Sequence, residues 1–286
     1  MRNIFYRILS WFTIPFIGFS KKKLRVLAYH TVNDEVSFEK QLIYISKNFN
    51  VISSDDLKQH LLQNKALPEK ALLITFDDGD ISVLEKGLPV LKKYNLPAVL
   101  FVITELINTS KPFWWYEMEQ LLDKKTADSK VWEVKKMTNT ERLAYMDEIR
   151  SLSESQIKQR QLTTKELKLL HSSNITVANH SHTHPMFDKS TVEELESEMN
   201  MAHDYLKENG FAYEMFAYPN GNYDLTAEKV LSEKGIEYAF LFDHLINDRK
   251  INPLRISRIR VNAEDNLYEF KAKVSGLHSL IMNLTK

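Results

Sequence analysis

The chain of 286 residues contains no cysteine. It therefore has no disulfide framework, no Cys-ligated zinc or iron–sulfur site, and no thiol nucleophile. Any metal must be held by histidine and carboxylate side chains.

Net charge is also missing, since 38 basic residues balance 38 acidic ones. Proteins that bind nucleic acid normally carry a basic excess, so we expect no nucleic-acid partner. The composition is otherwise that of a globular protein, with 43% hydrophobic and 27% charged residues. The length suits one large domain or two small ones.

The apolar N-terminal run, from Ile4 to Phe19, is shorter than the roughly 20 residues that a membrane-spanning helix needs. Arg7 and Pro15 interrupt the run, and the lysines at 21–23 follow it. A cleaved signal peptide is disfavoured, because the positive charge follows the apolar run and a small-residue cleavage pattern is missing.

Two interpretations of residues 1–23 remain open. The segment is either an anchor that lies in the membrane interface or an apolar arm packed on the protein's own surface. In an anchor, four aromatic side chains would lie among the lipid headgroups: Trp11, Phe12, Phe16 and Phe19. The lysines would then favour the cytoplasmic face of the membrane, with the extracytoplasmic cell envelope as the alternative.

Short β-rich runs alternate with amphipathic stretches after residue 23. The expected strands are 24–29, 71–76, 97–103, 174–179, 214–219, 236–242 and 255–261, and the expected helices include 37–48, 81–94, 192–209 and 226–234. Capping boxes mark two helix starts, Thr163 with Glu166 and Ser190 with Glu193. This alternation predicts a single α/β domain, a (β/α) barrel over residues 24–286, with an irregular excursion at about 111–163.

The sequence "LLITFDDGD" places Asp77 and Asp78 directly after an expected buried strand. Polar groups at the C-terminal ends of barrel strands face the active site. Adjacent residues on an extended strand point in opposite directions, so the two carboxylates can have different tasks. Taken alone, an Asp-Asp-Gly sequence is more often a turn.

The sequence "NITVANHSHTHP" places His180 and His184 after another expected strand, on the same face of the barrel. Two neutral imidazoles and one carboxylate are the ligand set of a hydrolytic zinc or another divalent metal. His182 lies between the two histidines and is expected to point away.

Together, "TFDDG", "NHSHTHP" and "FAYPNGNYD" resemble the three leading motifs of the NodB-type polysaccharide deacetylases, which are metal-dependent carbohydrate esterases with a distorted (β/α) barrel. The resemblance runs from about residue 26 to 261. It implies that Asp78, His180 and His184 hold a divalent metal, with zinc favoured. It also implies that Asp77 is the general base and that a backbone N–H near Asn220 stabilises the developing oxyanion.

Two features depart from the family pattern. The arginine that usually orients the base is replaced by Ala217, and Arg258 is the expected substitute, with Arg255 and Arg260 behind it. The usual late Leu-x-His motif is also not clear, because "LHS" around His278 lies close to the C-terminus.

A subgroup of the family supplies the general acid from the N-terminal part of the chain. The sequence "VLAYHTV" resembles that arrangement and makes His30 the expected acid, with His278 as the competitor.

Aromatic residues near the site are expected to contact the substrate. Trp114 and Trp115 could form a wall on which a sugar ring stacks, although core packing explains them equally well. Tyr218, in "FAYPNG", is expected to be a third substrate contact.

We therefore expect a metal-dependent hydrolase that removes the N-acetyl group from an amino sugar of a surface polysaccharide or of its lipid-linked precursor. An amine anion is a very poor leaving group, so the presence of both a base and an acid favours N-deacylation. Deformylation of a lipid-carried amino sugar is one alternative. A carbohydrate-binding pseudoenzyme is another, although a binding module needs neither Asp77 nor His30. The sequence does not indicate the oligomeric state.

Overall fold

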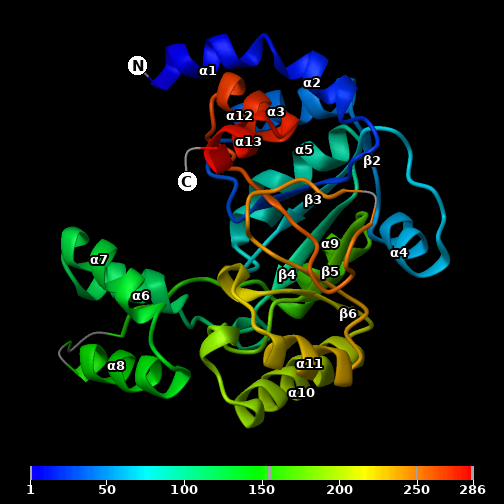
Figure 1. Cartoon of the computed structure of the whole chain (residues 1–286). Helices are drawn as coiled ribbons and strands as arrows, with labels where there is room; N and C mark the ends of the chain where they lie inside the picture. Colours follow the sequence, from blue (N-terminus) through cyan, green and yellow to red (C-terminus); the bar gives the residue numbers. More distant parts are fainter. Residues whose placement is uncertain (1, 152, 154–155, 249, 285–286) are drawn as a thin grey trace.

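The computed structural model describes residues 2–151, 153, 156–248 and 250–284 (Figure 1). Its strands are β1 (Arg25–Tyr29), β2 (Asn50–Val51), β3 (Ala71–Phe76), β4 (Ala98–Val102), β5 (Ile175–Asn179), β6 (Ala212–Ala217), β7 (Tyr238–Phe240) and β8 (Ile259–Arg260). The strands form one sheet in the order β7-β6-β5-β4-β3-β1-β8, and β2 pairs with β3. These named strands all pair in parallel and the sheet curls into a half-barrel, so the predicted α/β class and distorted barrel are confirmed.

Helices surround the sheet. They are α1 (Arg2–Ser10), α2 (Thr13–Phe19), α3 (Glu35–Asn48), α4 (Ser54–Gln63), α5 (Leu88–Lys93), α6 (Trp114–Leu121), α7 (Lys124–Val134), α8 (Asn139–Ser151), α9 (Thr164–His171), α10 (Val192–Glu208), α11 (Leu225–Glu233), α12 (Leu267–Ser275) and α13 (Leu277–Leu284). A π-helical turn, Val83–Gly87, precedes α5, and together they form the helix predicted at 81–94.

The central strands are apolar on both faces, because both faces are covered. Every residue of β1, β3 and β4 is buried. Leu27 and Ile74 pack in the cluster that includes the residues of α3 and α5. Val26 and Leu73, one position earlier, belong to a second cluster inside the barrel. Burying side chains of this size stabilises the fold by about 1.5–3 kcal/mol each, which explains why the strands are legible in the sequence.

The last strand is shorter than predicted. Of the expected run 255–261, only Ile259–Arg260 pairs with β1. Ile256 instead forms a bridge with Phe240 of β7. Residues 255–261 thus form backbone hydrogen bonds with β7 at one end and with β1 at the other. Neither β7 nor β1 has a complete ladder with this segment, so the barrel is distorted where it closes.

One predicted helix start is confirmed and one is wrong by one residue. Thr163 and Glu166 form the capping box of α9. Helix α10 is capped by Thr191 with Glu194, not by Ser190 with Glu193. The hydroxyl of Ser190 donates to the carbonyl of Met186 instead, which leaves the adjacent threonine to cap the helix.

The excursion from the barrel contains α6, α7 and α8, which stand apart from the sheet in Figure 1. They have a small apolar core of their own, formed by Trp114, Met118, Val134, Met146 and Ile149 together with Met186 from the barrel. This core keeps the three helices at one side of the strand ends.

Helices α1 and α2 pack on α12, at the top of Figure 1. Tyr6 and Leu9 are buried against Ala272 of α12, and Ile17 is also buried. One side of the N-terminal segment is therefore packed on the protein's own surface. Among the helices that the structure describes, none is long and apolar enough to cross a bilayer.

Candidate metal and catalytic site

Three buried side chains come together at the ends of two strands: Asp78 follows β3, and His180 and His184 follow β5. Oδ1 of Asp78 lies 3.3 Å from Nε2 of His180 and 3.6 Å from Nε2 of His184. Ligand atoms bound tetrahedrally at about 2.0–2.2 Å from a metal lie roughly 3.3–3.6 Å from one another. The two distances to Asp78 match this range, and the ligand atoms of all three side chains lie within 4.8 Å of one another, so the cluster could hold a divalent cation with positions left for water or substrate.

The turn after β5 brings the two imidazoles to Asp78. Nδ1 of His180 lies 2.8 Å from the carbonyl oxygen of Ala217, which leaves Nε2 to face the carboxylate. Such a bond fixes the tautomer and the ring orientation of a metal-binding histidine. Ser181 and His184 have positive φ angles of 69° and 58°, so the chain turns sharply enough for histidines four residues apart to converge.

Two of the three side chains have protonation states that suit a cation, whereas the hydrogen bond to Asp78 and the charges of Asp77 and Asp78 raise the pKa of His180 despite its burial. Burial lowers the pKa of His184, and the neighbouring His180 lowers it further, to about 3, so this imidazole is neutral at physiological pH. Burial alone would raise the pKa of Asp78. The hydrogen bond with His180 and the interactions with the neighbouring histidines outweigh that effect and hold the pKa well below its usual range. Asp78 is therefore an ionised carboxylate.

His182 turns away from the three candidate ligands. Its Nδ1 lies 2.9 Å from the hydroxyl oxygen of Thr104. The backbone N–H of His182 donates to Glu198 at 2.8 Å. The residue thus contributes to the shape of the turn and not to the cation site.

Glu198 of α10 supports this turn, and it is not among the residues that the sequence pattern predicts. Its carboxylate accepts hydrogen bonds from the backbone N–H of Thr183 at 2.8 Å and from the Thr183 hydroxyl at 2.6 Å, besides the one from His182. The side chain is 5% exposed and lies between Leu195 and Met199 on the buried face of the helix. A charged residue within the apolar stripe of an amphipathic helix is the sequence signal that could have identified it.

Asp77 forms a buried ion pair with Arg258. Nη1 and Nη2 of Arg258 donate to Oδ1 and Oδ2 of Asp77 at 2.6 and 2.7 Å. Burial raises the pKa of Asp77, but the charge and hydrogen bonds of Arg258, together with the charges of His180 and His30, outweigh it and hold the pKa below its usual range. Of the arginines suggested by the sequence, Arg258 is the one that contacts Asp77, whereas Arg255 pairs with Glu228.

His30 follows β1 and lies on the same side of the barrel as the two aspartates. Its ring packs edge-on against Phe242, with 5.2 Å between the ring centroids. Its charge helps to lower the pKa of both Asp77 and Asp78. The structure therefore brings His30 into the electrostatic environment of the carboxylates.

His278 lies in a different environment, on α13. Its Nδ1 is 2.7 Å from Nε2 of His244, and its ring packs against Tyr6 of α1. Burial lowers the pKa of His278, and Lys273 lowers it further. The two candidate acids are thus separated, and only His30 is coupled to the aspartates among the interactions described.

The turn that carries Asn220 is held against the segment that packs on His30. Asn220 has a left-handed conformation, with φ of 55°, and is followed by Gly221 with φ of 74°. A Cβ atom at Gly221 would collide with the backbone of Phe242, so only glycine fits there. This close approach keeps the turn next to the site.

The aromatic residues of α6 differ in their surroundings. The ring of Trp115 lies 4.9 Å from that of His184 and stacks on Phe113. Trp114 is 6% exposed and belongs to the small core of the excursion. Both line a cavity beside His184, where Trp115 is half-buried and Trp114 is buried.

The expectation that the Tyr218 side chain contacts substrate is wrong in this structure. Tyr218 is fully buried and packs against Phe216 and Phe187. Phe216 and Tyr218 point into the layer of α10 and α11, whereas Ala217 between them faces the barrel interior. The alternation of side chains along β6 and beyond it thus directs the ring away from the site.

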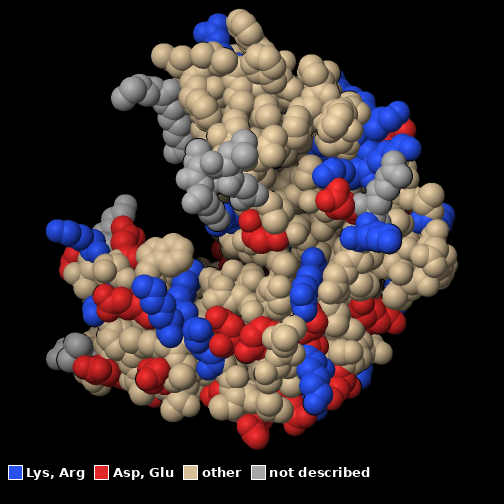
Figure 2. All heavy atoms as spheres, in the orientation of Figure 1, with Lys and Arg blue, Asp and Glu red and all other residues tan. Residues whose placement is uncertain are grey.

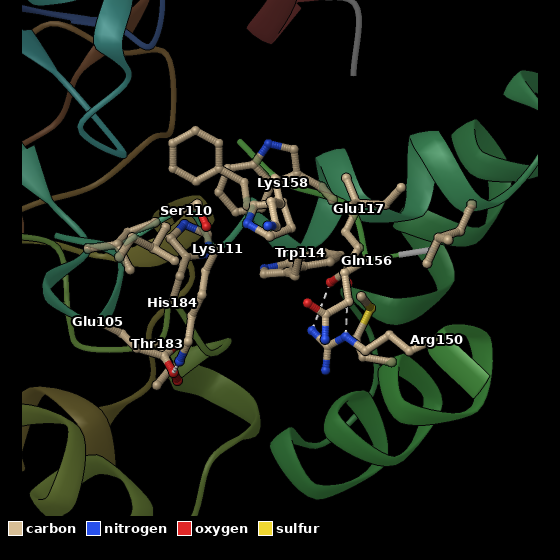
Figure 3. Close-up of a pocket in the computed structure, with 18 of the residues that line it drawn as sticks. Glu105, Ser110, Lys111, Trp114, Glu117, Arg150, Gln156, Lys158, Thr183 and His184 are labelled. Atoms are coloured by element: carbon tan, nitrogen blue, oxygen red, sulfur yellow. Dashed lines mark hydrogen bonds and ion pairs between the residues drawn. The ribbon is translucent and has the colours of Figure 1, made fainter. Parts of the chain in front are cut away.

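The cavity beside His184 has a volume of about 800 Å³, within the range of about 300–1,000 Å³ that is typical of small-ligand sites. Figure 3 shows Thr183 and His184 on one side and Trp114, Glu117 and Arg150 on the other. Arg150 and Glu117 form an ion pair of 2.8 Å. The excursion therefore forms one wall of a cleft whose other wall carries His184, one of the three candidate ligands.

Comparison with protein families gives one match over most of this region. Residues 64–239 match the model of a family described as polysaccharide deacetylase. That segment contains Asp77 and the three candidate metal ligands. His30 and Arg258 lie outside it.

Known relatives are similar over part of their length. YxkH of Bacillus subtilis is 33% identical over 94 residues, which are 30% of this chain and 34% of YxkH. The poly-β-1,6-N-acetyl-D-glucosamine N-deacetylase of Staphylococcus aureus is 22% identical over 223 residues, which are 76% of this chain and 63% of that protein. The chain thus matches less than two thirds of the length of either relative.

Two solved structures have the same fold. The deacetylase PplD of Streptococcus pyogenes aligns with a TM-score of 0.65 and 19% identity, over 88% of this chain and 98% of PplD. IcaB from Ammonifex degensii aligns with a TM-score of 0.62 and 20% identity, over 84% of this chain and 92% of IcaB. At these identities the likeness establishes the fold alone.

Proposed function

Because the chain belongs to the polysaccharide deacetylase family, we propose that it is a divalent-metal-dependent hydrolase that removes the N-acetyl group from an amino sugar of a surface polysaccharide or of its lipid-linked precursor. The observation that carries the proposal is the buried cluster of Asp78, His180 and His184 next to the Asp77–Arg258 pair. A cation site beside an ionised carboxylate is an arrangement that can activate water for hydrolysis of an amide.

Zinc is the cation that we propose, because two imidazoles and one carboxylate are a common zinc ligand set. When bound, such a cation lowers the pKa of a coordinated water to about 7 and polarises the acyl oxygen. The neutral state of His184 and the ionised state of Asp78 support this assignment.

Asp77 is the group that we propose as general base. It accepts a proton from the attacking water, and the remaining hydroxide adds to the carbonyl carbon. Arg258 keeps the carboxylate ionised and fixes both of its oxygens. The backbone N–H of Asn220 stabilises the negative charge that develops on the acyl oxygen.

His30 is the proposed general acid. It donates a proton to the sugar nitrogen as the carbon–nitrogen bond breaks, so that the products are acetate and a free amino sugar. The electrostatic coupling of His30 to Asp77 and Asp78 supports this role.

Our proposal for the substrate class rests on the cavity and on the relatives. Trp115 offers an aromatic face beside His184, and the cavity of about 800 Å³ has room for a sugar unit. The Staphylococcus aureus relative is named for a β-1,6-linked N-acetylglucosamine polymer. A short oligomer of that sugar is therefore the first substrate to test.

The test is acetate release from this oligomer by the purified chain, after removal of metal and after addition of zinc. We expect release only with metal, and much less from an Asp77→Asn variant that binds zinc normally. Release of formate from an N-formyl amino sugar, with no release of acetate, would favour the deformylase alternative. Binding of the oligomer without release of either acid would show a pseudoenzyme.

A further inference from the structure

Helices α1 and α2 are apolar on two sides. Tyr6, Leu9 and Ile17 point inward and are buried on the protein, together with Thr13. The opposite side presents Ile4, Phe5, Ile8, Trp11, Phe12, Ile14 and Phe19, with Trp11 74% and Phe19 89% exposed. Large apolar side chains on one face of a helix are normally covered, and this outward side has no partner among the described residues.

This outward side is a concentrated patch. Of the 17 large apolar side chains that are exposed within the described part of the chain, seven lie between Ile4 and Phe19, whereas the others are scattered. Scattered apolar residues are ordinary on a protein surface, but a contiguous patch marks an interaction site.

A groove in this patch is lined by apolar side chains alone. Its volume is about 490 Å³, and the residues that line it are Leu9, Phe12, Pro15, Phe16, Phe19 and Leu277. A lysine-rich hollow of about 580 Å³ adjoins it and shares Phe19. Apolar and cationic surfaces therefore meet at the end of α2.

The lysines of this hollow are Lys21, Lys22, Lys23 and Lys250. Glu69 pairs with Lys21 and Asp248 pairs with Lys23, so the cluster keeps a positive excess. The first 33 residues contain no Asp or Glu. In Figure 2 the surface over α1 and α2 is almost free of charged side chains, and basic ones gather where α2 ends.

The segment is held rigidly on the barrel by Arg25. This buried guanidinium donates to the carbonyl oxygens of Val274 and Ser275 at the end of α12 and to the hydroxyl of Ser20 at the end of α2. The patch is thus a fixed face of the folded domain and not a loose tether.

We propose that this face, residues 4–22 with Lys250, is a docking surface for an anionic lipid bilayer. Aromatic side chains next to lysines are the pattern of interfacial membrane binding, in which apolar groups enter the acyl boundary and cations meet the headgroups. A second copy of the chain is a poorer occupant, because a symmetric contact would bring the lysine clusters of two copies together.

The test is sedimentation of the full chain with vesicles of phosphatidylcholine alone and of phosphatidylcholine mixed with phosphatidylglycerol. We expect binding to the anionic vesicles, weakened by salt. Trp11→Ser combined with Phe19→Ser should weaken it by roughly tenfold for each side chain, because a buried aromatic is lost from the lipid at each position. Trp132→Ser, a change at an equally accessible tryptophan on α7 that is 67% exposed, should leave binding unchanged.

A lysine variant tests the electrostatic part. Lys21→Gln with Lys22→Gln should weaken binding by roughly fivefold for each lysine on anionic vesicles. Brominated lipid should quench the tryptophan fluorescence of the native chain more than that of a Trp11→Phe variant. Because this substitution keeps an apolar aromatic side chain, the fold is not expected to be disturbed.

Three outcomes would overturn the proposal: no binding to either vesicle, equal loss in the Trp132 variant, or a concentration-dependent dimer that the Trp11/Phe19 variant abolishes without any effect of lipid. None of these measurements uses catalysis, so the proposal stands or falls separately from the proposed function.

Discussion

The two terminal nitrogens of Arg258 lie 2.6 and 2.7 Å from the two carboxylate oxygens of Asp77, in a pair with almost no exposure to solvent. Both oxygens are thus fixed by one planar group, which sets the orientation of the carboxylate as well as its charge. The arginine comes from the connection between β7 and β8, whereas the family pattern places it where Ala217 stands. A side chain from a different segment can therefore serve the same carboxylate.

Arg258→Met should leave the Asp77 carboxylate buried without its cation. We expect a loss of about 3–5 kcal/mol in the free energy of unfolding, measured with urea at neutral pH. The folded-state pKa of Asp77 is lowered, so its contribution to stability is present above the unfolded value of about 3.9 and is lost as the pH falls through the folded value. The difference between the variant and the native chain should therefore shrink in acid. An equal difference at all pH values would contradict this account.

His180→Ala and His184→Ala should each abolish zinc binding, because each removes one of three protein ligands. His182→Ala is the matched control, since its imidazole bonds to Thr104 and not to the cation site. Zinc content after dialysis and the rise of Tm on zinc addition are the measurements. Equal metal loss in all three variants would remove the ligand assignment.

Asp77→Asn and Asp78→Asn should differ although the residues are adjacent. Asp78→Asn should empty the cation site, whereas Asp77→Asn should retain zinc and lose turnover. Metal analysis and acetate release on the same preparations separate the two effects. If Asp77→Asn alone loses the metal, the roles of the two aspartates are reversed.

Glu198→Ala should weaken zinc binding by roughly 10–100-fold, the usual effect of removing a group that orients metal ligands. The change breaks three hydrogen bonds to the turn between His180 and His184. Glu196→Ala is the control, because this half-buried glutamate of the same helix pairs with Lys234 and not with the turn. Glu198→Gln keeps one acceptor oxygen and should restore part of the affinity. A stability loss without any change in zinc affinity would show a purely structural role.

His30→Ala should reduce hydrolysis of an N-acetyl sugar by a factor of about 10²–10⁴, as expected for loss of a general acid. Hydrolysis of an activated aryl acetate should fall far less, because its leaving group needs no proton. His278→Ala is the competing variant, and its histidine bonds to His244 instead of approaching the aspartates. Selective loss of amide hydrolysis in the His278 variant would transfer the role of acid to that residue.

The sequence predicts the features of this protein that are encoded locally. Strands buried on both faces need continuous apolar runs, so β1, β3 and β4 can be predicted from the sequence. The candidate metal ligands can also be predicted, because they directly follow the ends of strands. Features that depend on contacts between distant segments cannot be predicted in this way. Two adjacent residues could each cap α10, and a contact with Met186 decides between them. The direction of Tyr218 depends on which face of β6 is covered.

Support from distant elements is the other part that local patterns miss. Glu198 reaches the histidine turn from a helix, and its role depends on where that helix docks. The excursion is recognisable as irregular in sequence, but its three helices and their separate core are settled by packing against Met186.

The pairing of Asp77 with Arg258 joins residues 181 positions apart. A nascent chain emerges from the ribosome with its N-terminus first, so the three candidate ligands emerge well before Arg258 does. A nascent chain that ends before Arg258 would contain all three candidate ligands, but Asp77 would lack its arginine partner and the barrel would be open beside β1. The order of synthesis therefore makes this hydrolytic site one of the last parts of the molecule to be completed.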